Sequence, residues 1–151
     1  APDLSLRLLK LGFKTTLIKD AFVFHKRRIS WSKFYKQVNK FGMVRPILNQ
    51  WHPTSKSITY WLPTLFTLGL IAAGILGLFN IMIPIYLYVF YYSVAFVLAL
   101  FSSRSLVVAL LSLVAISIQF FGYGYGFIKS TINLVVLRKQ PERAFPYLFF
   151  R

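Results

Sequence analysis

The chain has 151 residues, of which 57% are hydrophobic and 19% aromatic, and its mean hydropathy of +0.62 lies outside the range of ordinary soluble domains. Eighteen Lys and Arg against three acids give a net charge of +15, and the absence of cysteine excludes a disulfide framework and a thiolate metal site. Twelve of the basic residues precede Ser57, whereas the stretch from Ile58 to Ile128 contains one charged residue, Arg104. This separation disfavours a nucleic-acid binder, whose basic residues spread over a soluble domain.

Residues 1–29 begin without a start methionine or a signal-peptide pattern, and we expect them to be the C-terminal remnant of a domain that precedes them. Asp3 is placed to cap a short helix, and Gly12 is placed to end it. After this helix, the β-type composition of residues 14–18 and 21–25 predicts two short extended segments.

Residues 30–57 are expected to form an amphipathic basic interface helix followed by a linker. Ser30 is a suitable N-cap, and aromatic and aliphatic side chains then recur at helical spacing while lysines occupy the other faces. The apolar stripe consists of Trp31, Phe34, Tyr35, Val38 and Phe41. The stripe suits a helix that lies in the membrane interface, and equally a helix that packs against a preceding domain.

Residues 58–128 are long enough for three transmembrane helices, because a bilayer core about 30 Å thick needs about 20 apolar residues. Solid apolar runs favour helices over a β-barrel, whose strands alternate in polarity. The predicted spans are 58–79, 81–101 and 105–121, with turns at Asn80 and at residues 102–104. A basic tail, 129–151, completes the chain.

The positive-inside rule places the basic N-terminal half in the cytoplasm, and Arg104 returns to that side after two crossings. A third crossing would put the tail outside, although it carries five basic residues: Lys129, Arg138, Lys139, Arg143 and Arg151. Two alternatives remain open. Either the tail is tolerated outside, or one of the three spans does not fully cross.

Residues 1–50 resemble the membrane-anchored family 2 glycosyltransferases of bacteria, in which a GT-A domain precedes interface helices and transmembrane helices. The order and spacing of several short motifs carry the resemblance. The matching residues are Asp3 to Leu8, Gly12 to Lys14, Val23 to His25, Arg28, Ser30, Gln37, Gly42 and Arg45, and in the apolar half Gly122 to Phe127. The resemblance implies a mainly α membrane protein that begins with the C-terminal edge of a GT-A α/β domain.

By this resemblance the parent protein is an inverting enzyme, in which an Asp of a Glu-Asp pair removes a proton from the acceptor hydroxyl. That base would fall at or before Ala1, so residues 1–151 alone are expected to be inactive. The donor is expected to be a nucleotide-sugar, and the acceptor a lipid-linked sugar or a polysaccharide. Mg²⁺ or Mn²⁺ is expected as the cofactor, bound mostly by the preceding domain.

Two of the candidate site residues lie in the short basic stretch that precedes Ser30. His25 is a candidate ligand for the metal or the diphosphate, with a structural histidine as the alternative, and imidazole would favour Mn²⁺. Arg28, beside Arg27, is a candidate for neutralising the diphosphate, with a lipid headgroup contact as the alternative.

Three further candidates lie on or before the interface helix. Gln37 and Arg45 occupy the region where relatives carry Gln-x-x-Arg-Trp, and are expected on the acceptor or diphosphate side. The Arg-Trp pair is absent at that spacing, which argues against a processive, cellulose-synthase-like activity. Asp3 is a candidate for a supporting catalytic role, with a helix cap as the alternative.

The sequence therefore predicts part of a transferase that adds sugars at the cytoplasmic face of the bacterial inner membrane. The expected partners are membrane lipids and, through the preceding domain, the donor and the acceptor, but not nucleic acid. The alternative is a small, non-enzymatic integral membrane protein with a basic lipid-binding arm. A channel or transporter is disfavoured, because the spans contain no acid and no histidine.

Overall fold

A computed structural model describes residues 2–14, 16–18, 20–24 and 30–149, and in this part of the chain all regular structure is helical. The long helices are α2, α3, α4 and α5, and short helical segments connect and follow them. Their bounds are α1 Pro2–Lys10, α2 Trp31–Trp51, η1 Pro53–Ser55, η2 Ile58–Trp61, α3 Leu62–Leu78, α4 Ile83–Ser103, α5 Leu106–Thr131, the π-helical turn η3 Ile132–Val136, α6 Pro141–Ala144 and α7 Pro146–Phe149.

The N-terminal segment contains the expected helix but not the expected strands. Helix α1 begins at Pro2, so Asp3 lies in its first turn rather than at the predicted N-cap position. The helix ends before Gly12, whose φ of +84° is the left-handed conformation that glycine adopts at a helix end. Residues 14, 16–18 and 21–24 form no strand, so the prediction of two extended β segments is wrong for this described part. No strand lies beside them in the part of the chain that the structure describes, and an isolated strand is not stable in water.

Helix α2 begins where the sequence predicts but buries a different face. The Ser30 hydroxyl accepts a hydrogen bond from the Lys33 amide, 3.3 Å, which confirms the N-cap. Of the predicted stripe, Val38 is buried, whereas Trp31, Tyr35 and Phe41 remain 45%, 40% and 58% exposed. The buried face continues past the stripe and consists of Val38, Gly42, Met43, Pro46, Ile47 and Leu48.

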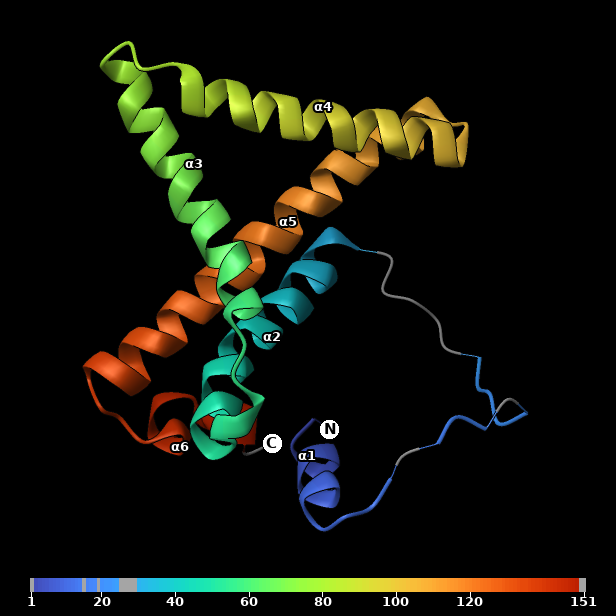
Figure 1. Ribbon diagram of the computed structural model, residues 1–151, viewed down its shortest axis with the longest axis vertical. Helices are drawn as coiled ribbons and strands as arrows, with labels where there is room; N and C mark the ends of the chain where they lie inside the picture. The colour runs from blue at the N-terminus through green and yellow to red at the C-terminus, as the bar shows by residue number, and fades with distance from the viewer. Residues whose placement is uncertain (1, 15, 19, 25–29, 150–151) are drawn as a thin grey trace.

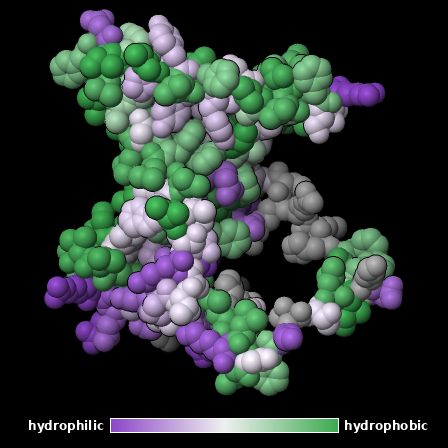
Figure 2. Space-filling model, viewed as in Figure 1, coloured by the Kyte–Doolittle hydropathy of each residue, from purple (hydrophilic) through white to green (hydrophobic). Residues whose placement is uncertain are grey.

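Three helices are long and apolar enough to cross a membrane, as the sequence predicts: Ile58–Leu78, Ile83–Ser103 and Leu106–Val136. Both turns between them lie where expected, with Asn80 and Arg104 in left-handed conformations. In Figure 1, α3 and α5 cross, and α4 extends between their ends that lie far from α2. Figure 2 shows apolar surface over these helices and hydrophilic side chains gathered near the end of α2 and the C-terminal segment.

The third apolar helix is longer than predicted. The predicted span ends near residue 121, whereas α5 continues to Thr131 and into η3. Glycine normally weakens a helix. Here Gly122 and Gly126 face α2, and Gly124 faces α3, so these small residues allow both helices to approach the α5 backbone.

The α2–α5 contact is too close for any side chain at its centre. A Cβ atom on Gly42 would overlap the carbonyl oxygen of Tyr123, and one on Gly126 would overlap the carbonyl oxygen of Asn39. The Asn39 side-chain amide donates to the Gly122 carbonyl, 2.9 Å, and fixes the register of the two helices. The helices run parallel, because later residues of α2 meet later residues of α5.

The C-terminal segment folds back onto α2. Met43 and Ile47 of α2 form one buried cluster with Leu134 of η3 and with Phe145. At the same end of the molecule, Trp61 packs edge-on against Phe127 with ring centroids 4.8 Å apart. The start of α3, the end of α5, the end of α2 and the C-terminal segment therefore lie together (Figure 1).

Candidate membrane-interface site

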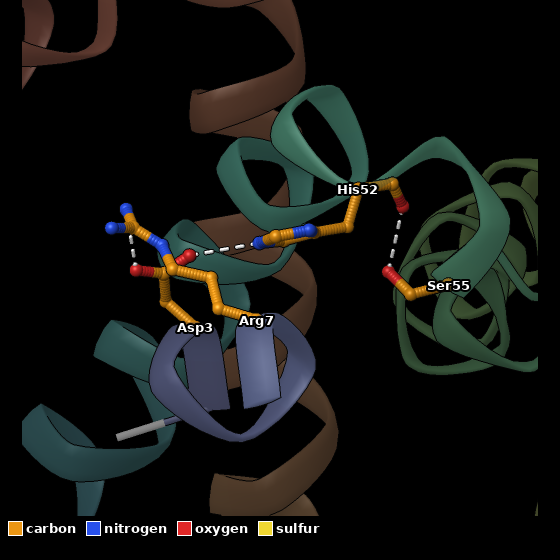
Figure 3. Close-up of polar contacts among 4 residues, drawn as sticks. All are labelled: Asp3, Arg7, His52 and Ser55. Carbon is orange, nitrogen blue, oxygen red and sulfur yellow. Dashed lines mark hydrogen bonds and ion pairs between the residues drawn. The ribbon is translucent and has the colours of Figure 1, made fainter. Parts of the chain in front are cut away.

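A polar contact joins α1 to the end of α2, 49 residues away in the sequence. His52 Nε2 lies 2.8 Å from Asp3 Oδ1, and Arg7 Nη2 lies 2.9 Å from Asp3 Oδ2, so one carboxylate serves both partners (Figure 3). The His52 carbonyl accepts a hydrogen bond from the Ser55 hydroxyl, 2.9 Å. His52 is 5% exposed, so this contact joins α1 to a buried side chain at the end of α2.

Asp3 therefore acts here as the partner of two basic side chains rather than as a free carboxylate. The hydrogen bond from His52 lowers the pKa of Asp3 most, loss of solvent around the carboxylate opposes it, and the Arg7 guanidinium lowers it further, so the pKa lies below its ordinary value of 3.8. A carboxylate whose pKa is lowered by docking stabilises the docked state at pH values above the pKa that it has in the unfolded chain. This stabilisation is lost as the pH falls through the folded value.

We expect α1 to leave α2 in acid. The chain has no cysteine, so single cysteines at the exposed positions Leu9 and Thr54 accept spin labels selectively. The fraction of molecules in which the two labels lie close together should persist down to about pH 4 and decrease below it. In Asp3→Asn this fraction should already be smaller at neutral pH. The decrease should be at most about fivefold, because solvent partly screens the contact. Identical pH profiles for the two proteins would show that Asp3 does not control docking.

Arg45 holds the linker that leads into the first apolar helix. Its guanidinium donates to the Ser55 carbonyl and lies over the Tyr60 ring, with Cζ 3.5 Å from the ring centroid. Stacking and a directed hydrogen bond together use the planar shape of the guanidinium, which lysine lacks. This geometry gives Arg45 a structural role at the start of the span.

Gln37 lies elsewhere, in a groove of about 600 Å³ beside α2 whose wall also includes Lys36 and Lys40. The three described candidates therefore occupy three separate surroundings: Asp3 pairs with His52, Arg45 holds the linker, and Gln37 lines the groove. His25 and Arg28, with Arg27, lie outside the described residues. The metal and diphosphate roles that the resemblance implies therefore stay predictions.

The described residues do not fit a divalent cation. Among them, no three His, Cys, Asp or Glu side chains come together. The one carboxylate near a histidine, Asp3, is already paired with His52 and Arg7, and the Arg7 charge opposes a cation at this place.

Sequence reasoning missed His52, Lys36 and Lys40. A His-Pro pair directly after a long helical pattern is a signal for a helix end, and it would have drawn attention to His52. Two lysines spaced i, i+4 without an intervening acid indicate a cationic strip on one helix face. Neither signal identifies the partner, because the contacts come from distant segments.

No family model, curated protein or solved structure matches the chain. The assignment of a function therefore depends on the chain's own residues and contacts.

Proposed function

We propose that the chain is the membrane-anchoring part of a family 2 glycosyltransferase and holds the catalytic domain at the cytoplasmic face of the bacterial inner membrane. The supporting observation is the docking of α1, the segment that resembles the end of a catalytic domain. Asp3 of α1 contacts the buried His52 at the point where α2 ends and the apolar helices begin. A domain that continues into α1 is thereby fixed in place beside the membrane.

The arrangement of α2 along α5 supports a position at the membrane surface. The apolar segment Leu106–Val136 has 31 residues and is about 46 Å long, which exceeds the hydrocarbon thickness of about 30 Å. Helix α2 packs along the second half of α5, and it carries exposed lysines and aromatic side chains. Such a helix belongs at the level of the lipid headgroups, with α5 leaving the hydrocarbon beside it.

The packing also favours one of the two topologies that the sequence leaves open. The C-terminal segment contacts α2 through the cluster of Met43, Ile47, Leu134 and Phe145, so both lie on one side of the membrane. In this proposal α3 and α5 each cross the membrane, whereas α4 does not cross it and connects their outer ends. The basic tail then returns to the cytoplasm. The positive-inside rule is then satisfied by both basic segments.

In the proposed enzyme the reaction itself belongs to the preceding domain. That domain would bind the nucleotide-sugar and the divalent cation and supply the carboxylate base, while the anchor keeps the site close to a lipid-linked or polysaccharide acceptor. Keeping the donor site and the acceptor at one membrane surface raises the rate of sugar transfer, because the two reactants are held close together. The helices described here contribute position rather than proton transfer.

The reading frame upstream of the codon for Ala1 tests the proposal first. We expect about 200 to 250 in-frame residues, the length of one domain, with an Asp-x-Asp motif and a terminal Glu-Asp pair. Membranes that contain the protein from that whole frame should transfer labelled sugar from a nucleotide-sugar, and a Glu-Asp variant with the Asp changed to Asn should lose at least about a hundredfold in rate. A start codon close to Ala1 would instead favour the small non-enzymatic membrane protein.

A further inference from the structure

The groove beside α2 has a wall with two positive charges. Lys36 and Lys40 are one helical turn apart on α2, and both line the groove together with Gln37. Tyr147 of α7 also lines the groove, and its hydroxyl lies 3.1 Å from the sulfur of Met43. The C-terminal segment and α2 thus form the groove together.

The chain supplies no counter-charge for these two lysines in the part that the structure describes. The chain has only three acids, and the ion pairs among described residues both involve Asp3, which contacts Arg7 and His52. Like charges spaced i, i+4 on a helix repel each other. An anion that contacts both ammonium groups would remove this repulsion, so the groove is complementary to a negatively charged ligand.

The position of the groove indicates the origin of that anion. Asn39 and Gly42, on the same stretch of α2 as the lysines, contact the backbone of α5 near Gly122 and Tyr123, within the apolar segment. Phe41 also lines the groove and is 58% exposed. Cationic side chains beside exposed apolar rings, next to a membrane-spanning helix, are placed at headgroup level.

We propose that this groove binds the phosphate of an anionic glycerophospholipid. The ammonium groups of Lys36 and Lys40 contact the phosphate oxygens, the Gln37 amide donates to the headgroup, and Phe41 and Tyr147 contact the glycerol end of the acyl chains. A volume of about 600 Å³ accommodates a headgroup with its glycerol backbone rather than a phosphate alone. The proposal concerns lipid binding and does not depend on a transferase activity.

The test measures binding of short-chain phosphatidylglycerol to the full chain in a neutral detergent by calorimetry. The double variant Lys36→Gln, Lys40→Gln should bind about 10- to 30-fold more weakly. The reason is that each lysine beside an anionic lipid contributes about three- to fivefold to the binding constant. The matched control Lys129→Gln, Lys139→Gln removes the same charge from exposed positions outside the groove and should change binding less than about twofold. Lys36→Arg, Lys40→Arg should retain binding.

Three outcomes would overturn the proposal. An equal loss in the control pair would mean that net charge, rather than the groove, attracts the lipid. Inorganic phosphate that binds as tightly as phosphatidylglycerol would identify a free anion as the ligand. An isoprenoid monophosphate that binds more tightly than phosphatidylglycerol would assign the groove to a different lipid class.

Discussion

Replacing Gly42 with alanine is expected to weaken the contact between α2 and α5 by about 1–3 kcal/mol, the cost typical of overpacking a close contact. The added Cβ would overlap the Tyr123 carbonyl oxygen and lie 3.0 Å from the Phe127 amide nitrogen. Both obstacles belong to the backbone of α5, so no side-chain rotation relieves the overlap. The measurement is the detergent-dependent unfolding of the purified chain.

Gly74→Ala is the matched control, because it makes the same chemical change in an apolar helix. A Cβ at Gly74 meets nothing within 4 Å, so this substitution should be neutral or should stabilise α3 by up to about 1 kcal/mol through helix propensity. If both variants lost the same stability, the sensitivity would come from glycine in general, and the close α2–α5 contact would have no special importance.

The second large effect concerns which side of the membrane each turn faces. Single cysteines at positions 80, 103 and 140, all exposed, report sidedness in intact cells through a maleimide that does not cross the membrane. We expect labelling at positions 80 and 103 from outside, and labelling at position 140 only after the cells are permeabilised. The reason is that the C-terminal segment packs on α2, whose basic residues favour the cytoplasm.

Three full crossings would give a different pattern. Position 103 would then be protected, and position 140 would be labelled in intact cells. A cysteine at Thr54, in the linker that follows α2, serves as the internal standard for the cytoplasmic side. Labelling of Thr54→Cys from outside would reverse the orientation and contradict the proposed location of the N-terminal half.

The sequence predicted the local features of the fold. Ser30 caps α2, Gly12 follows α1 in a left-handed conformation, and turns occur at Asn80 and Arg104. Each of these depends on neighbouring residues, either through a hydrogen bond from a side chain to a nearby amide or through the end of an apolar run. Such interactions can be inferred from spacing alone.

The lengths of α2 and α5 could not be inferred in this way. Pro46 and the glycines from Gly122 to Gly126 normally favour the end of a helix, yet both helices continue through them. Each helix is stabilised there by the other, since Gly42 and Gly126 bring the two backbones together. Helix propensity is weak compared with tertiary packing of this extent.

The same distinction applies to the candidate site. The sequence identified Asp3, Gln37 and Arg45 as polar residues of interest, but it did not pair Asp3 with His52 or bring Lys36 and Lys40 into one groove with Tyr147. These contacts join segments that are 49 and more than 100 residues apart, and no periodicity encodes them. His25 and Arg28 remain predictions from the resemblance.

By itself the sequence determined the division into a basic and an apolar half, the number of apolar helices and their turns, because hydrophobicity and capping are local properties. Only the tertiary structure decided which face of α2 is buried, how far α5 extends and where the C-terminal segment lies. The physical reason is that these features depend on shape complementarity between distant helices, in which the absence of a side chain at Gly42 matters as much as any side chain that is present.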